Sequence, residues 1–152
     1  DSGWMPRLAL APELVEPAIA EGLRVTTPSP VMLRSVVAAD RIGSVAVRAG
    51  DRVILATFLA NGASGGFDPE TNSAASLKQL WFGAGSHFCL GAPLALAQVR
   101  VTLGALLAAG PLEVESRRPA RGVLIPSYAS FVIRQLSSPK GVSKPPHETP
   151  KP

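Results

Sequence analysis

The stretch Phe82-Gly83-Ala84-Gly85-Ser86-His87-Phe88-Cys89-Leu90-Gly91, here called the Cys loop, holds the only cysteine of the chain. A single thiol excludes an intrachain disulfide and a multi-cysteine zinc or iron–sulfur site. Cys89 can then be a structural thiol, a reactive or redox-sensing thiol, or the lone thiolate ligand of a metal cofactor. Three glycines let the backbone turn tightly and let a bulky group approach it. A helical pattern follows at once, and free N–H groups at a helix start stabilise a thiolate.

The composition predicts a globular domain. The chain has 152 residues, of which 46% are hydrophobic and 17% charged, with a net charge of +4. No cluster of Lys and Arg alternates with aromatic residues, so we expect no nucleic-acid binding. The longest uncharged stretch, residues 79–99, contains Gly, Ser, His and Gln, so we expect no membrane span. The first residues lack a signal-peptide pattern, and a single free thiol fits a reducing compartment, so the sequence predicts a cytoplasmic protein.

We expect one helix well before the Cys loop in the sequence and a second helix directly after it. Residues 16–24 have an apolar face and are followed by two prolines, Pro28 and Pro30, which end a helix. Residues 90–109 repeat apolar side chains at helical spacing until Gly110-Pro111. We expect four side chains of this second helix to lie in the core: Val101, Leu103, Leu106 and Leu107.

Short strands are expected between and after these helices. Residues 31–38 are rich in β-branched side chains, and residues 45–47 and 52–57 flank a turn at 48–51 that predicts a hairpin. Residues 62–76 are Gly-rich and irregular, and residues 112–114 and 130–135 are further strand candidates. Residues 137–152 contain five prolines and few apolar residues, which predicts a disordered Pro/Lys tail after a folded part at 1–136.

The pattern Phe-Gly-x-Gly-x-His-x-Cys-x-Gly resembles the haem-binding loop of the cytochrome P-450 family. It is followed by Ala92-Pro93-Leu94-Ala95, as in bacterial, soluble members. The resemblance implies a mainly α fold with small β-sheets and haem b as cofactor, with Cys89 as the iron ligand. It also implies that the loop residues Phe82, Gly83, Gly85, His87 and Gly91 bind the cofactor, with Phe82 near the sulfur and His87 on a haem propionate.

Residues outside the Cys loop carry further parts of the resemblance. Arg34 corresponds to a propionate-binding arginine, and Glu21 with Arg24 corresponds to the family's buried E-x-x-R pair. Residues three apart share a helix face, so this carboxylate and guanidinium can meet. The family's third partner is an Arg or His in the irregular segment. The comparable residues 67–72 offer neither, and neither Thr71 nor Asn72 can replace a guanidinium, so we expect this region to be less rigid than in the family.

The resemblance covers residues 4–135, which correspond to the C-terminal third of the family's catalytic domain. It implies a haem-thiolate monooxygenase that inserts one oxygen atom from O2 into a small organic substrate. The electron donor would be a ferredoxin- or flavin-type partner. The alternative is a truncated or degenerate scaffold or interaction domain without catalysis. Such a piece would leave an apolar face of the long helix uncovered, which predicts self-association.

Overall fold

The computed structural model describes residues 3–62, 65–72, 80–123, 125 and 127–136. Within these residues the helices are α1 (Trp4–Leu10), α2 (Val15–Thr26), α3 (Thr57–Gly62) and α4 (Ala92–Ala108), and three single 3-10 turns are η1 (Pro12–Leu14), η2 (Leu80–Phe82) and η3 (Gly85–His87). The strands are β1 (Met32–Ser35), β2 (Asp40–Ile42), β3 (Val45–Val47), β4 (Arg52–Leu55), β5 (Leu112–Pro119) and β6 (Tyr128–Gln135). The predicted mainly α fold with small β-sheets is confirmed. The predicted tail at 137–152 lies outside the described residues.

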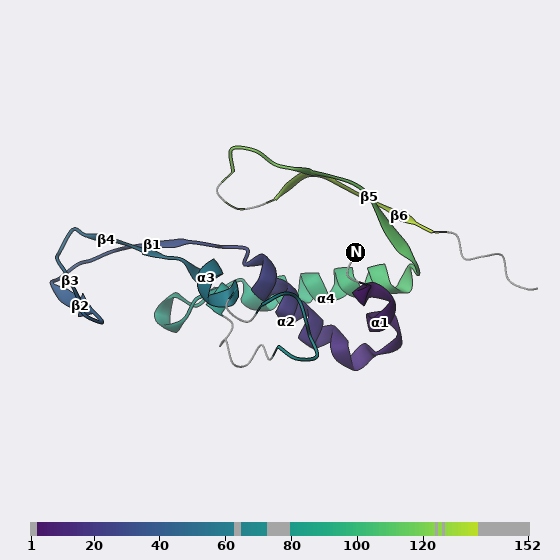
Figure 1. Cartoon of the computed structure of the whole chain (residues 1–152), viewed down its shortest axis with the longest axis horizontal. Helices are drawn as coiled ribbons and strands as arrows, with labels where there is room; N and C mark the ends of the chain where they lie inside the picture. The colour runs from purple at the N-terminus through teal and green to yellow at the C-terminus, as the bar shows by residue number, and fades with distance from the viewer. Residues whose placement is uncertain (1–2, 63–64, 73–79, 124, 126, 137–152) are drawn as a thin grey trace, which may run out of the picture.

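Helix α2 is the centre of the packed region. It contacts α3, α4 and η1, and Figure 1 shows it crossing α4, with α1 near the end of α4 that leads into β5. Pro17 lies in the first turn of α2, where a missing N–H costs little. The helix ends at Thr26, and the C-cap Thr27 has a left-handed φ of 37° and donates its N–H to the carbonyl of Leu23. Among the described residues, the buried apolar side chains are Leu8, Ala18, Ile19, Trp81 and Ala92.

The long helix α4 is less covered than its sequence predicts. Leu103, Leu106 and Leu107 are half-buried, but Val101 is 73% exposed, so its prediction as a core residue was wrong. Apolar residues occur on every side of α4, and such a pattern does not single out one buried face. The sides of α4 that do not face α1 and α2 therefore carry exposed apolar side chains such as Leu94.

The strand pairing in residues 32–55 differs from the predicted hairpin. β3 pairs with β2, and β4 pairs with β1, both antiparallel, so the strands on either side of residues 48–51 do not pair with each other. The turn at 48–51 does form, since the N–H of Asp51 donates to Arg48 O, but Gly50 then bonds Val36 and turns the chain back toward β1. The hairpin forms instead at Gly43-Ser44, where Gly43 has a φ of 61°. A two-residue Gly-Ser turn is a strong hairpin signal that the sequence analysis missed.

The remaining strands form a two-stranded ribbon. β5 and β6 pair antiparallel from Leu112↔Gln135 to Pro119↔Tyr128, with two register shifts, and both are longer than predicted. Gly110, with a φ of 85°, ends α4 and redirects the chain, so that the ribbon runs back over α4 in Figure 1.

Helix α3 was not predicted, because residues 52–57 were predicted to be one strand and only Arg52–Leu55 is extended. None of the helices in the described part of the chain is long and apolar enough to cross a membrane.

Candidate functional site

The Cys loop is closed by its own backbone. The N–H of Cys89 donates to the carbonyl of Phe82 over 2.8 Å, and the N–H of Phe88 donates to Gly85 O over 3.1 Å. The rings of Phe82 and Phe88 meet edge to face with centroids 6.1 Å apart. Phe82 therefore contacts Cys89 through its backbone and Phe88 through its ring, and together these contacts define the course of the loop.

Two glycines of the Cys loop are required by backbone conformation. Gly83 has a φ of 76°, and a Cβ there would lie 3.2 Å from the carbonyl oxygen of His87. Gly85 has a φ of 64°, which is also left-handed. Gly91 differs: its φ of −82° suits any residue, and a Cβ there would lie 3.8 Å from Cys89 Sγ. Glycine at position 91 thus keeps the backbone beside the sulfur bare.

Cys89 lies just ahead of α4, with its side chain exposed. The carbonyl of Cys89 accepts the N–H of Ala92, and that of Gly91 accepts the N–H of Ala95, so the first helical turn is anchored on the loop. The helix begins at Ala92, two residues later than predicted. Within the described residues, no acceptor is found for the backbone N–H groups of Leu90 and Gly91. These donors follow Cys89 directly in the chain, at the start of α4, where the helix dipole is positive.

The two predicted propionate-binding residues lie apart. His87 is exposed in η3. Arg34 is exposed in β1, where its Nη1 donates to Leu33 O over 2.9 Å and its Nη2 lies 4.0 Å from Met32 Sδ. No contact among the described residues joins Arg34 to His87 or Cys89. The structure therefore leaves the guanidinium of Arg34 free of acidic partners but does not bring it to the Cys loop.

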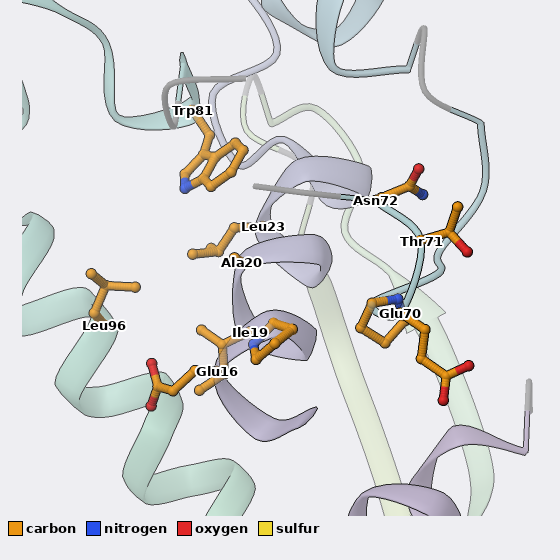
Figure 2. A pocket seen from close by; sticks show the side chains of 11 residues that line it. Glu16, Ile19, Ala20, Leu23, Glu70, Thr71, Asn72, Trp81 and Leu96 are labelled. Carbon is orange, nitrogen blue, oxygen red and sulfur yellow. The ribbon is translucent and has the colours of Figure 1, made fainter. Parts of the chain in front are cut away.

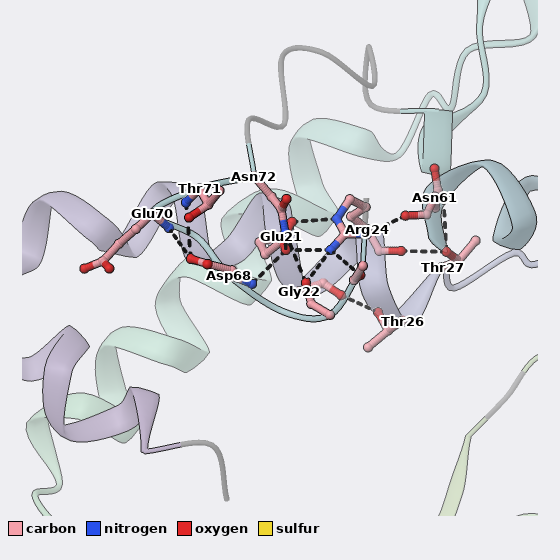
Figure 3. Close-up of polar contacts among 12 residues, drawn as sticks. Glu21, Gly22, Arg24, Thr26, Thr27, Asn61, Asp68, Glu70, Thr71 and Asn72 are labelled. Atoms are coloured by element: carbon pink, nitrogen blue, oxygen red, sulfur yellow. Dashed lines mark hydrogen bonds and ion pairs between the residues drawn. The ribbon is translucent and has the colours of Figure 1, made fainter. Parts of the chain in front are cut away.

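Glu21 and Arg24 are brought together as a buried ion pair on α2. Each side chain is 1% exposed, and Arg24 Nε and Nη2 donate to the two carboxylate oxygens of Glu21, each over 2.6 Å (Figure 3). Arg24 also donates to three backbone carbonyls, those of Asn61, Gly65 and Gly66. One guanidinium thus connects α2 to the end of α3 and to the irregular residues that follow it.

Glu21 has further partners in the irregular segment. Its Oε1 accepts the N–H of Asp68 over 2.9 Å and the side-chain Nδ2 of Asn72 over 2.7 Å (Figure 3). Burial raises the pKa of Glu21, but the hydrogen bonds from Arg24, Asp68 and Asn72 together outweigh it and lower that pKa to about 2. Residues 67–72 thus supply no cation, but the amide of Asn72 donates to the carboxylate without carrying a charge, a contact that the sequence analysis did not predict.

Asn61 is a buried residue of this network whose contacts the sequence analysis did not predict. It is fully buried at the end of α3, and its Nδ2 donates to Thr27 Oγ1 over 3.0 Å. Thr27 Oγ1 in turn donates to the carbonyl of Arg24 over 2.7 Å. Helix α3 also packs against η2, which leads into the Cys loop. The ion pair and the loop are therefore linked through α3.

A hollow of about 490 Å³ lies beside α2 and is separate from the Cys loop. Figure 2 shows Trp81, Leu23 and Leu96 on one side of α2, with residues 70–72 on the other. The indole N–H of Trp81 has no hydrogen-bond partner among the described residues. Cys89 is not among the lining residues, so the hollow is not part of the loop's surroundings.

The chain is similar in sequence to bacterial cytochromes P-450. It is 36% identical over 136 residues to cytochrome P-450 130 of Mycobacterium tuberculosis, which covers 84% of this chain and 32% of that protein. It is 35% identical over 116 residues to the C-19 steroid 1alpha-hydroxylase of Sorangium cellulosum, covering 70% of this chain and 28% of that protein. The chain spans about a third of the length of the curated relatives it matches. No family model matches the chain.

Solved structures give the same result for the fold. The cytochrome P-450 enzyme CYP109B1 of Bacillus subtilis superposes with a TM-score of 0.77 and 31% identity over 88% of this chain and 38% of that protein. CYP164A2 of Mycobacterium smegmatis superposes with a TM-score of 0.77 and 29% identity, over 88% of this chain and 35% of that protein. The described elements thus recur, in the same arrangement, within longer proteins.

Proposed function

We propose that the chain carries the haem-thiolate centre of a monooxygenase, with Cys89 as the iron ligand, because its sequence and fold are similar to part of bacterial cytochromes P-450. The observation that supports this most is the geometry of the Cys loop. Cys89 is exposed ahead of α4 and next to the bare backbone of Gly91, and the N–H groups of the two residues that follow it have no acceptor in the described part of the chain. A thiolate in such a place is stabilised by the helix dipole and can accept those N–H groups.

Two features of the described residues fit a haem. Gly91 places no side chain beside Cys89, where a Cβ would lie 3.8 Å from Sγ, and this leaves room for a flat cofactor next to the sulfur. Two exposed nitrogen-bearing side chains, His87 and Arg34, are free of acidic partners and could each bind a propionate. When bound, haem b would supply the oxygen chemistry, and an axial thiolate favours O–O bond cleavage.

The residues of this chain would hold and tune that centre. Cys89 would donate the thiolate, and the N–H groups of Leu90 and Gly91 would hydrogen-bond it and so set its donor strength. Gly83 and Gly85 would give the loop its course, and Phe82 would fix Cys89 through its carbonyl. In the proposed activity a small organic substrate receives one oxygen atom in the cytoplasm, with electrons from a ferredoxin- or flavin-type partner.

A haem titration of the purified chain tests this function. We expect saturation at one haem per chain and a thiolate-type absorption spectrum that Cys89→Ser abolishes. His87→Ala is the matched control, because it should weaken haem affinity and leave the spectrum of the bound form unchanged. Absence of haem uptake by the chain, or a Cys89→Ser spectrum equal to that of the wild type, would refute the proposal.

One observation favours a second function, that of a non-catalytic scaffold or interaction domain. Large apolar side chains are exposed on several described elements, with Leu90 at 98% and Leu94 at 65%. Exposed apolar surface of this kind is typical of an interaction site. In this alternative the chain would associate with itself or with another polypeptide and would bind haem weakly or not at all.

A further inference from the structure

The hollow beside α2 has apolar walls that come from three elements. Its volume is about 490 Å³, which is within the range of pockets that bind small organic molecules. Residues three and four apart share one face of a helix, and α2 turns such a face toward the hollow. The apolar side chains that line it are Ile19, Ala20 and Leu23 on α2, Leu96 on α4 and Trp81 in η2 (Figure 2).

The indole of Trp81 brings a polar atom to these walls. Trp81 is 6% exposed, and its Nε1 has no hydrogen-bond acceptor among the described residues. Figure 2 shows this nitrogen on the side of the ring that is turned toward Leu23 and Leu96. A buried indole N–H usually has a partner, because an unpaired buried donor costs free energy. A water molecule there would need a further polar partner, which the two leucine side chains do not offer. The unpaired N–H therefore points to an occupant of the hollow that carries an acceptor.

Two carboxylates limit the charge of such an occupant. Glu16 and Glu70 line the hollow, with side chains that are 58% and 45% exposed. Each is already paired with an arginine, Glu16 with Arg100 and Glu70 with Arg7. An anion would face these two carboxylates, whereas a cation would find their charge already balanced. A neutral molecule therefore fits the hollow best.

We propose that this hollow is a binding site for a small, neutral, mainly apolar molecule that carries a carbonyl-type oxygen, with Trp81 Nε1 as the donor to that oxygen. The apolar part of the molecule would lie against Ile19, Leu23 and Leu96, and its oxygen would supply the acceptor that Trp81 lacks. Binding here requires neither Cys89 nor haem, so this site goes beyond the proposed function and can fail or succeed independently of it.

An NMR titration of the haem-free chain with acetophenone tests the site without any variant. This probe is neutral and joins an aromatic ring to one carbonyl group. We expect a saturable downfield shift of the indole N–H proton of Trp81 as the hydrogen bond forms. The indole of Trp4 is the internal control, because it contacts Phe67 and Arg7 and does not line the hollow. Absence of a saturable shift at Trp81 would overturn the proposal.

Cumene is the matched probe for the hydrogen bond. It has the shape of acetophenone with a methyl group in place of the carbonyl oxygen, so it can fill the hollow but cannot accept a hydrogen bond. We expect cumene to bind more weakly and to produce no downfield shift of the Trp81 indole proton. A downfield shift equal to that produced by acetophenone would overturn the role of the indole as donor.

Trp81→Phe removes the donor and keeps an aromatic ring. The Kd of acetophenone, followed through the resonances of the probe, should rise about three- to tenfold, the usual worth of one hydrogen bond. The Kd of cumene should change much less, and Trp4→Phe should leave both affinities unchanged. Equal changes for the two probes in Trp81→Phe, or no change for either, would contradict the proposal.

A variant that fills the hollow tests where the probes bind. Ala20→Phe places a large ring on the wall formed by α2 and should abolish binding of both probes. Ala97→Phe is the matched control, since Ala97 is exposed on α4 and does not line the hollow. It should leave both affinities unchanged. Acetophenone binding to Ala20→Phe with wild-type affinity would place the probe elsewhere and overturn the assignment of the site.

Discussion

Replacing Glu21 by Gln tests the buried ion pair most severely. The substitution keeps the shape of the side chain but leaves the guanidinium of Arg24, which is 1% exposed, without a counter-charge. It also replaces one of the two carboxylate oxygens, which together accept four hydrogen bonds, by an NH2 group that cannot accept. Removing one partner of a buried pair typically costs about 3–5 kcal/mol. We expect a loss of this size in the free energy of unfolding.

The lowered pKa of Glu21 also indicates how much its carboxylate contributes to the free energy of unfolding. The pKa is lowered from 4.5 to about 2, so the folded state favours the ionised carboxylate. The difference, at about 1.36 kcal/mol per pH unit, corresponds to roughly 3 kcal/mol. A lowered carboxyl pKa stabilises the fold above the unfolded value, and this stability is lost as pH falls from about 4.5 toward 2.

Urea unfolding followed by circular dichroism at pH 7 and at pH 3 measures both effects. Wild type should lose stability between these pH values, and Glu21→Gln should lose much less because the titrating group is absent. Glu16→Gln is the matched control on the same helix: Glu16 pairs with Arg100, but the two side chains are 58% and 50% exposed. Exposed pairs contribute at most about 1 kcal/mol. A Glu21→Gln unfolding free energy within error of Glu16→Gln would refute the reasoning.

Two further predictions concern the Cys loop and the exposed face of α4. Gly83→Ala should destabilise the loop by about 1–3 kcal/mol, because it combines a left-handed φ with a Cβ 3.2 Å from His87 O. The control Gly104→Ala, within α4, should be neutral or stabilising. Thermal unfolding compares the two variants, and equal unfolding midpoints would contradict the loop geometry. The chain should self-associate through its exposed apolar residues. The double variant Leu90→Lys, Leu94→Lys should lower the apparent mass of the chain in analytical ultracentrifugation. An unchanged sedimentation profile would place the association elsewhere.

Some parts of the structure were predictable because they depend on local sequence. Helices α2 and α4 follow from apolar spacing and from the Pro and Gly residues that end them. The meeting of Glu21 and Arg24 follows from their separation of three residues on one helix. The course of the Cys loop depends on glycines whose φ angles other residues rarely adopt.

Other parts depend on contacts between distant segments. Asn72 meets Glu21 across 51 residues, and no local pattern shows that an amide will replace a charged partner there. The pairing of β1 with β4 depends on how the chain returns after the Gly43-Ser44 turn. Val101 could not be assigned to a face because α4 is apolar on all sides, and only its packing decides which side is covered.

The absorption spectrum of the reduced, CO-bound protein tests most directly whether Cys89 ligates the iron. After the chain is loaded with haem, we predict a strongly red-shifted Soret band in the wild type, which is absent in Cys89→Ser and present in His87→Ala. A red-shifted band that survives in Cys89→Ser, or its absence from the haem-loaded wild type, would contradict ligation of the iron by this sulfur.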